Sequence, residues 1–388
     1  MKVLIVHNDY GRYSGEEAVV DQMAVMFGHL GYEVAFFRRT SEGSRDALGG
    51  KVKAFVSGIY SPSGVRGMRE ALKRECPDIV NVHNLYPFIS PAALFECRRA
   101  GVPVVMTVHN YRLACPTGLF MRHGVPCEKC LKQGSEWSCV WHNCEHSWPK
   151  SIAYALRNTV ARWTGAYAKC VNRFVCLSEF QKSKLIEAGF SAEKIVVIPN
   201  SLDVEAEPLP MTGQYVGYLG RLSYEKGYDL LLDVARRLPN IPFRFAGAQR
   251  EGAADQELPS NVQLMGYLSG DDLREFVTKS RFIVMPSRCY EGFPIAILEA
   301  AQQMKPVVAP RHGGFTEIVG EGADAIGCLF KPGRSDSLEK EVMELWNHPQ
   351  HCVDLGRKAF LKLRNNYSTA CAQSKWASLL SACCCQKS

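Results

Sequence analysis

The stretch RFIVMPSRCYEGFPIAILEAAQQ, residues 281–303, passes from an apolar run through a short polar loop into a segment with helical spacing. RFIVMPS is a candidate buried strand, and PIAILEAAQQ is a candidate helix beginning at Pro294. Proline is favoured at the first helical position because the N–H that it lacks would have no partner there. The backbone N–H groups of Gly292 and Phe293 would then face an incoming anion. The stretch therefore predicts a strand, a ligand-binding loop and a helix.

This alternation of strand and helix recurs along the 388 residues, a length that favours two domains over one core. Continuous apolar strands between helices indicate parallel sheets covered on both faces. We expect an α/β protein with two facing, doubly wound, Rossmann-like domains and a cleft between them. The first would span residues 1–198, and the second residues 199–365, beginning with the linker PNSLDVEAEPLPMTGQ (199–214). Residues 366–388 would form a helix that packs back on the first domain. The expected strands are KVLIVH, YEVAFF, DIVNVH, PVVMTVH, FVCLS and IVVIP, then YVGYLG, FRFAGA, VQLMGYL, FIVMPS and PVVAP.

The charge of the chain is uneven. Residues 1–200 carry 25 Lys and Arg against 17 Asp and Glu, a net charge of +8, and the remainder carries 21 against 22. A basic first half indicates an anionic partner such as a membrane surface or a lipid phosphate, although a solvated surface is equally compatible. Nucleic acid is disfavoured because no binding motif or dense basic stripe is present. The start MKVLIVHNDY fits a buried strand better than a signal peptide, and we expect a cytoplasmic protein, peripheral at the inner face of the membrane.

Two further loops of the second half contain groups suited to a phosphate. In YLGRLSYEKG, Gly220 ends a strand, and Arg221 and Lys226 follow it shortly before a helix expected from about Gly227. A guanidinium and an ammonium beside a helix N-terminus can hold a diphosphate. In PRHGGFTEIV, Gly313 and Gly314 allow the backbone to come close to a ligand.

Two glutamates eight positions apart, Glu291 and Glu299, flank the apolar run of the opening stretch. Eight helical residues rise about 12 Å. The paired carboxylates of glycosidases lie about 5 to 9.5 Å apart across one bond. We therefore interpret the two side chains as contacts for opposite ends of one extended ligand.

Taken together, these segments resemble retaining glycosyltransferases of family 4, which have the GT-B fold. The resemblance covers nearly the whole chain and rests on GYLGRLSYEKG, PSRCYEGFPIAILEA, PRHGGFTEIV, VCLSEFQKSKLIEAGF and IPNSLD. It implies transfer of a sugar from a nucleoside diphosphate sugar to a glycan or lipid-linked acceptor, in cell-surface polysaccharide synthesis. It also implies front-face attack with retention. Cations would replace a catalytic metal, since no Asp-x-Asp motif is present, and no cofactor is required.

The resemblance also assigns roles to residues. Arg221 and Lys226 would hold the donor diphosphate, Glu299 the ribose hydroxyls, and Glu291 the transferred sugar. The remaining donor contacts would come from Gly15, Gly220, Gly292, Phe293, Pro294, Gly313 and Gly314.

The first domain would contribute histidines to the same reaction. His109, in TVHN, would contact the donor sugar near its anomeric centre. His83, in NVHNL, would lie on the acceptor side, with a buried, hydrogen-bonded structural histidine as the alternative. The loop GRYSGEE (11–17) departs from the usual double glycine because Ser14 precedes Gly15.

Other classes of protein fit the sequence less well. A GT-B sugar-nucleotide epimerase would have no acceptor for a basic first domain to bind. A nicotinamide dehydrogenase is disfavoured because HNDYGRYSGEE lacks the G-x-G-x-x-G pattern. A non-catalytic sugar-nucleotide-binding protein would not need the complete set of Arg221, Lys226, Glu291 and Glu299.

A cysteine-rich insert is expected at residues 114–147, where Cys127 and Cys130 form a C-x2-C pair flanked by Cys115 and Cys144. Four thiolates could hold a structural zinc ion in a segment that has no core of its own. Cys139, His123, His142 and His146 are spare ligand candidates. Disulfides and cysteines packed as small hydrophobic residues remain alternatives.

A candidate membrane-contacting helix follows the insert, at residues 151–174. It mixes Arg157, Arg162, Lys169 and Arg173 with Trp163 and Tyr167. Basic and aromatic residues at helical spacing are typical of an interfacial helix, but a core-packing helix with solvated charges fits equally well.

Overall fold

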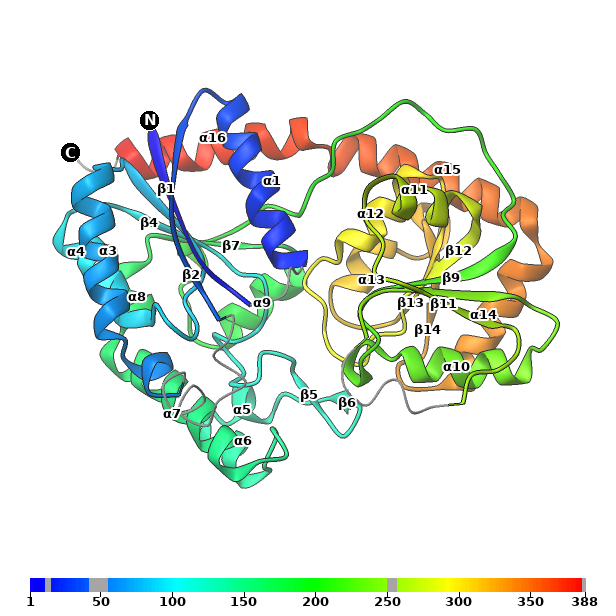
Figure 1. The fold of residues 1–388 in the computed structure, drawn as a ribbon, viewed down its shortest axis with the longest axis horizontal. Coiled ribbons are helices and arrows are strands. Elements are labelled where there is room, and N and C mark those ends of the chain that lie inside the picture. Colours follow the sequence, from blue (N-terminus) through cyan, green and yellow to red (C-terminus); the bar gives the residue numbers. More distant parts are fainter. Residues whose placement is uncertain (11–14, 42–54, 250–256, 386–388) are drawn as a thin grey trace. The chain divides into compact units, whose positions relative to one another are not determined.

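The computed structural model describes residues 1–10, 15–41, 55–249 and 257–385, and these divide into two compact units (Figure 1). The first unit comprises residues 1–118, 128–198 and 372–388, and the second comprises residues 119–127 and 199–371. Each unit contains a six-stranded parallel sheet. Most positions of the central strands are buried, which requires helices on both faces of each sheet.

The sheet of the first unit has the strand order β2-β1-β3-β4-β7-β8, and all its pairings are parallel. Its strands are β1 (Lys2–Asp9), β2 (Glu33–Thr40), β3 (Ile79–Asn84), β4 (Val104–Thr107), β7 (Arg173–Cys176) and β8 (Ile195–Val197). Its helices are α1 (Gly15–His29), α3 (Pro62–Glu75), η1 (Pro91–Ala93), α4 (Leu94–Arg99), α5 (Lys129–Lys132), α6 (Trp137–Trp141), α7 (Trp148–Thr164), α8 (Ala166–Cys170), α9 (Glu179–Glu187), η2 (Ala192–Lys194) and α16 (Thr369–Cys385). Trp376 of α16 packs edge-on against Phe27 of α1, with ring centroids 5.5 Å apart.

The sheet of the second unit has the order β11-β10-β9-β12-β13-β14, again with all pairings parallel. Its strands are β9 (Tyr215–Leu219), β10 (Phe243–Ala246), β11 (Val262–Gly266), β12 (Ser280–Val284), β13 (Val307–Pro310) and β14 (Gly327–Phe330), and a hairpin of β5 (Met121–Arg122) and β6 (Val125–Pro126) joins this unit. Its helices are η3 (Tyr224–Lys226), α10 (Tyr228–Arg237), α11 (Gly270–Lys279), α12 (Ile295–Gln302), α13 (Gly314–Val319), η4 (Gly322–Asp324), α14 (Ser335–Asn347) and α15 (Pro349–Asn366).

Every strand expected from the sequence is present, but the sequence pattern missed the sixth strand of the second sheet. That strand, β14, is only four residues long and contains a glycine, so it lacks a clear apolar run. A side chain at Gly327 would place its Cβ 2.0 Å from the carbonyl oxygen of Val307 on the neighbouring strand. Close backbone packing therefore requires glycine at this point.

The candidate interfacial helix at residues 151–174 is not continuous. It is divided into α7 and α8 at Gly165, whose φ of 71° ends the first helix. Arg157 and Tyr167 are both buried, so these two residues cannot contact a membrane. No helix in the described part of the chain is both long and apolar enough to cross a bilayer.

Candidate active site

The candidate residues lie near the ends of the strands at which the strand order of each sheet reverses. In the second sheet the order reverses between β9 and β12, and in the first sheet between β1 and β3. Ligands of open α/β sheets bind outside the carboxyl ends of the strands at such switch points. Arg221 and Lys226 follow β9, Glu291 follows β12, and His83 lies near the end of β3. Within the second sheet, the topology therefore brings together residues that are far apart in the sequence.

The loop after β9 has the positively charged groups that the sequence indicated. The Arg221 side chain is 45% exposed, and its Nη2 lies 3.4 Å from Glu225 Oε1. The helix begins at Tyr228, one residue later than expected, because Gly227 has a φ of 70° and acts as the cap. A Cβ at Gly227 would lie 2.0 Å from the carbonyl oxygen of Pro286, in the segment after β12, so the two segments touch through their backbones.

An ion pair joins the two loops. Lys226 Nζ lies 2.5 Å from Glu291 Oε1, which also accepts a hydrogen bond from Ser287 Oγ at 2.8 Å. Burial acts to lower the pKa of Lys226, but the negative charge of Glu291, aided by Cys289 and the hydrogen bond, outweighs it and the pKa is raised. Lys226 is therefore a fixed positive charge at neutral pH, held by a partner that an incoming phosphate could replace.

The glycines before α13 bring a third loop against the loop after β12. The Gly314 N–H donates to the Glu291 carbonyl oxygen at 2.9 Å, and a Cβ at Gly314 would lie 2.2 Å from the Gly292 carbonyl oxygen. Gly313 has a φ of 61°, in the left-handed region that favours glycine. Three loops thus form one compact edge at the carboxyl ends of β9, β12 and β13.

Glu299 lies on the helix that follows this edge. Pro294 caps α12 and the helix starts at Ile295, so Pro294 precedes the first helical position rather than occupying it. The estimate of about 12 Å between the two glutamates assumed eight helical residues and is wrong in that respect, because the first part of the interval is loop. Burial raises the pKa of the Glu299 carboxyl to about 7. This carboxyl therefore changes its charge near neutral pH.

Two positioning contacts were missed by the sequence analysis. Arg288 is buried and forms a two-pronged ion pair with Asp229 at 2.5 and 2.6 Å, and it also donates to the Tyr224 carbonyl oxygen at 2.8 Å. Asn200 Nδ2 donates to the Phe293 carbonyl oxygen at 2.8 Å. Arg288 is adjacent to the recognised motif, but only the fold shows that it faces α10. Asn200 belongs to IPNSLD, which indicated the family without indicating this contact.

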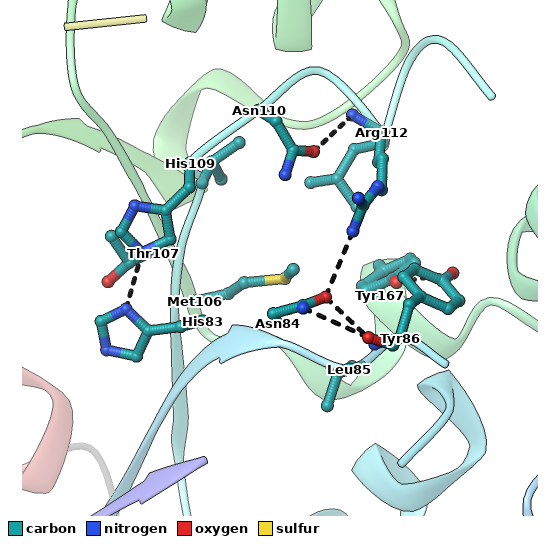
Figure 2. Close-up of a pocket in the computed structure, with 12 residues that line it drawn as sticks. His83, Asn84, Leu85, Tyr86, Met106, Thr107, His109, Asn110, Arg112 and Tyr167 are labelled. Carbon is teal, nitrogen blue, oxygen red and sulfur yellow. Dashed lines mark hydrogen bonds between the residues drawn. The ribbon is translucent and has the colours of Figure 1, made fainter. Parts of the chain in front are cut away.

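In the first unit, the buried Asn81 and His83 and the half-buried His109 form a directed chain of hydrogen bonds, and Figure 2 shows its His83–His109 link. Asn81 Nδ2 donates to the Val105 carbonyl oxygen and to Thr107 Oγ1, so its Oδ1 faces His83. His83 Nε2 and Asn81 Oδ1 are 2.6 Å apart, and His83 Nδ1 and His109 Nε2 are 2.7 Å apart.

The protonation of this chain follows from the pKa values. Burial, with the nearby His109 and His7, holds the pKa of His83 well below its usual value, and burial lowers that of His109 to about 4. Both rings are therefore neutral at pH 7, and each has one N–H and one lone pair. His83 donates from Nε2 to Asn81 and accepts at Nδ1 from His109. His109 consequently keeps a lone pair on Nδ1, with which it can accept a hydrogen bond.

A small pocket borders these histidines, and Figure 2 shows the residues that surround it. Arg112 Nη1 lies 3.3 Å from Asn84 Oδ1, and Tyr167 donates its hydroxyl to that of Tyr86 at 3.0 Å. His83 is 4% exposed and fully engaged in hydrogen bonds, which agrees with the structural alternative for this residue. Gly15 is the first residue of α1, whereas the rest of its loop, residues 11–14, lies outside the described residues.

The cysteines of the insert separate into two groups. Cys127 lies in the segment assigned to the second unit, where its N–H donates to the Phe120 carbonyl oxygen at 2.7 Å. Cys139, a spare candidate, is buried in the first unit. A hydrogen bond with the Cys144 side chain, together with burial, raises the pKa of Cys139, and Cys130 and Cys115 add to this shift. The structure therefore associates Cys139 with the other three thiols.

Comparisons with known proteins agree with this geometry. The family described as Glycosyltransferase Family 4 matches residues 13–206, and the family described as Glycosyl transferases group 1 matches residues 200–362. An uncharacterized 42.6 kDa protein in the cps region of Klebsiella pneumoniae is 33% identical over 249 residues, 62% of this chain and 59% of that protein. The O-antigen chain mannosyltransferase C of Escherichia coli is 29% identical over 174 residues, 41% of this chain and 46% of that protein. The matches thus span about three fifths or less of these relatives.

A solved structure extends the likeness over almost the whole chain. The crystal structure of Anabaena HepE in complex with UDP and glucose matches with a TM-score of 0.69 and 18% identity, covering 98% of this chain and 100% of that one. At this identity the likeness shows the fold alone, and that fold is GT-B. The two family matches cover both units, and the chain therefore belongs to glycosyltransferase family 4.

Proposed function

We propose that the protein is a retaining glycosyltransferase that moves a sugar from a nucleoside diphosphate sugar to a glycan or lipid-linked acceptor during cell-surface polysaccharide synthesis. The observation that carries the proposal is the Lys226–Glu291 ion pair at the switch point of the second sheet, beside Arg221. The names of the relatives support the product class: one is an O-antigen chain mannosyltransferase and another is encoded in a cps region. HepE was crystallised with UDP and glucose, which supports a nucleoside diphosphate donor.

The mechanism follows from the residues of the second unit. Arg221 and Lys226 stabilise the charge that develops on the leaving diphosphate, so that catalysis requires no metal. When the donor binds, Lys226 exchanges Glu291 for a phosphate oxygen, and the Glu291 carboxylate becomes available to the sugar hydroxyls. The N–H groups of Gly292 and Phe293 add dipoles beside the diphosphate, and Glu299 binds the ribose.

The proposal also assigns a role to His109 of the first unit. Its Nδ1 lone pair accepts a hydrogen bond from a hydroxyl of the transferred sugar, because Nε2–H is committed to His83. Attack on the same face that the diphosphate leaves retains the configuration, and a donor phosphate oxygen takes the proton of the acceptor. No side chain forms a covalent bond with the sugar in this route.

The deciding experiment incubates the purified chain with a panel of labelled nucleoside diphosphate sugars, with and without membrane extract as the source of acceptor. Donor consumption that depends on acceptor supports the transferase. Conversion of the donor without acceptor would instead indicate an epimerase. Binding without any turnover would indicate a non-catalytic protein. Analysis of the anomeric configuration of the product tests retention.

We also propose that α7 contacts an anionic membrane surface. Trp148, Ile152 and Trp163 are 53%, 39% and 85% exposed, and their spacing places them on one face of the helix. Arg162, beside Trp163, is also exposed, and residues 1–200 carry the net positive charge of the chain. Aromatic side chains with neighbouring basic groups suit the interface of an anionic bilayer. The exposed stripe thus differs from the predicted one, because Arg157 and Tyr167 face inward.

A flotation assay tests this contact with phosphatidylcholine vesicles that contain or lack phosphatidylglycerol. The Trp148→Ser, Trp163→Ser double variant should lose recovery from the anionic vesicles. Leu209→Ser, which alters an 86% exposed apolar residue of the second unit, should not. Equal recovery of wild type from both kinds of vesicle would refute the contact.

The structural zinc expected from the sequence remains a proposal, with a changed ligand set. We propose Cys115, Cys130, Cys139 and Cys144, because Cys139 interacts with the other three while Cys127 belongs to the hairpin segment. Four thiolates would stabilise the short helices α5 and α6 without a core of their own and leave no open position for catalysis. Elemental analysis of Cys139→Ser and Cys127→Ser, purified without metal-chelating resin, distinguishes the sets. Full zinc in Cys139→Ser would contradict our assignment.

A further inference from the structure

A cluster of buried polar side chains lies where β1 ends and α1 begins. His7 is completely buried, and neither of its ring nitrogens has a hydrogen-bond partner within the described residues. His7 Nε2 lies 3.6 Å from Asp9 Oδ1, and His7 Nδ1 lies 3.9 Å from Glu16 Oε1. Both separations are too long for hydrogen bonds. His7, Asp9 and Glu17 each offer one ligand atom, and these three atoms lie within 4.8 Å of one another.

An imidazole buried in this way is unusual. Its N–H group and its lone pair have both been removed from water, and neither has a hydrogen-bond partner among the residues that the structure describes. Asp9 Oδ1 and Glu16 Oε1 are likewise buried without a partner in the described part of the chain. Buried polar atoms without partners often indicate an ion or an ordered water. These atoms form two facing pairs, His7 Nε2 with Asp9 Oδ1 and His7 Nδ1 with Glu16 Oε1. The first pair indicates a ligand between His7 and Asp9.

The spacing suits a metal ion better than a water molecule alone. Nitrogen and carboxylate ligands bind first-row divalent ions at about 2.0 to 2.2 Å. Two ligands at that distance from one ion are separated by about 3 to 3.5 Å, which His7 Nε2 and Asp9 Oδ1 nearly meet. An imidazole nitrogen such as His7 Nε2 can offer its lone pair to a cation. The Asp9 side chain is 25% exposed, which provides a route of entry.

The remaining contacts resemble the surroundings of a metal ligand. A ligating histidine usually directs its second nitrogen at a carboxylate, which fixes the orientation of the ring. Here Nδ1 faces Glu16, and Glu16 Oε2 accepts the hydroxyl of Tyr10 at 2.9 Å. Glu17 Oε1 accepts the Tyr10 N–H at 3.2 Å, which positions the other glutamate of the first turn.

The charge of the cluster also favours a cation. Asp9, Glu16 and Glu17 supply three carboxyl groups, whereas the nearby Arg38 is already paired with Asp21 at 2.5 Å. Arg112, which acts on Glu16, is the second nearby cation. A divalent ion would neutralise two of the three carboxylates.

We propose that His7, Asp9 and Glu17 bind one divalent transition-metal ion, with Glu16 orienting His7 from the second shell. One nitrogen and two carboxylate oxygens favour Mn²⁺ or Zn²⁺ over Mg²⁺ or Ca²⁺, which prefer all-oxygen sites. The ion would join the end of β1 to the first turn of α1 and stabilise the first unit. This site is separate from the cysteines of the insert and does not depend on the proposed transferase activity.

The test uses the full-length chain, purified without metal-chelating resin and treated with a chelator. Mn²⁺ is titrated and followed by electron paramagnetic resonance, because Mn²⁺ has little affinity for thiolates. We expect one Mn²⁺ per chain and a rise in the thermal midpoint when it binds. Co²⁺ then identifies the ligands: binding at His7 gives weak visible bands without the strong near-ultraviolet charge-transfer band of a cobalt–thiolate bond.

Matched variants locate the ion. Asp9→Asn and Glu17→Gln should each weaken Mn²⁺ binding at least tenfold while the metal-free protein stays folded. Asp21→Asn removes the same charge from α1 at a residue outside the set, and it should change the affinity less than twofold. Two results would overturn the proposal: no Mn²⁺ bound at millimolar concentration, which would mean that the cluster holds a proton instead, or equal losses in Asp9→Asn and Asp21→Asn.

Discussion

The two units position their candidate residues by different physical means. In the second unit, paired charges hold the loops in place: Lys226 binds Glu291, and Arg288 binds Asp229. In the first unit, neutral side chains are connected by buried hydrogen bonds that start at Asn81. An anion-binding site needs fixed charges that can exchange one partner for another. A residue that contacts a neutral sugar hydroxyl needs a defined direction for its lone pair.

This difference predicts how each unit responds to mutation. Removing one member of an ion pair leaves the other member charged and partly buried, which is costly. Removing a neutral partner costs less in stability but releases the orientation of the group that it held. The five predictions below test that contrast.

Arg288→Ala should have the largest effect. The Arg288 side chain is 8% exposed and its partner Asp229 is 23% exposed, so the loss should destabilise the second unit by about 3 kcal/mol. Urea unfolding of the metal-free protein measures this change. Arg236→Ala is the control on α10, the helix that holds Asp229: its ion pair with Asp233 is exposed, and the loss should cost under about 1 kcal/mol. Equal destabilisation by both variants would argue against a positioning role for Arg288.

Lys226→Ala should weaken binding of the donor by about 1.5 to 3 kcal/mol, because one charge-assisted contact with the diphosphate is lost. Arg221→Ala should give a comparable loss. Isothermal titration with a nucleoside diphosphate, once a binding base is known from the donor panel, measures both. Unchanged affinity in both variants would exclude these residues from the phosphate site.

Glu299 should make binding of the nucleotide depend on pH. Its pKa of about 7 means that half of the carboxyl is protonated at neutral pH, and only the ionised form is a full acceptor for ribose hydroxyls. Affinity should therefore rise about tenfold between pH 6 and pH 8, in line with one proton released. Glu299→Gln should abolish this dependence. A parallel pH profile in the variant would assign the titration to another group.

The Glu299 carboxyl should also make the stability of the folded protein depend on pH. Stability should fall as the pH rises, whereas nucleotide affinity should increase. The folded protein holds the Glu299 proton more tightly than the unfolded chain, whose glutamate has a pKa near 4.5. Stability from this group is present below pH 4.5 and is lost as the pH rises towards 7. Glu299→Gln should therefore raise the thermal midpoint relative to wild type more at pH 8 than at pH 5.

Asn81→Ala should have the smallest effect on binding, about 1 kcal/mol or less, because a single neutral hydrogen bond is lost. Its specific consequence is that His83 can adopt either tautomer, which would leave the lone pair of His109 undefined. Nitrogen chemical shifts of the two imidazoles report the tautomers directly. Asn81→Asp keeps the acceptor and should restore the wild-type tautomers. A single unchanged tautomer in Asn81→Ala would show that Asn81 does not set the orientation.

Much of the candidate site in the second unit could be predicted from the sequence, because its residues lie in short motifs. Gly220, Arg221 and Lys226 are close in the chain, and Glu291 follows a recognisable strand. Apolar runs likewise identified eleven of the strands. Local patterns determine such features because a buried strand needs continuous apolar residues, and a tight turn needs glycine wherever a side chain would clash.

The tertiary structure decided the contacts between residues that are distant in the chain. Lys226 meets Glu291 only because β9 and β12 are neighbours in the sheet, an adjacency that no local pattern encodes. The same holds for His83 beside His109 and for Cys139 beside Cys144. Arg157 and Tyr167 looked like surface residues because periodicity shows which residues share a face of a helix, but not whether that face is covered. Burial and pairing depend on the packing of whole elements, which only the folded chain specifies.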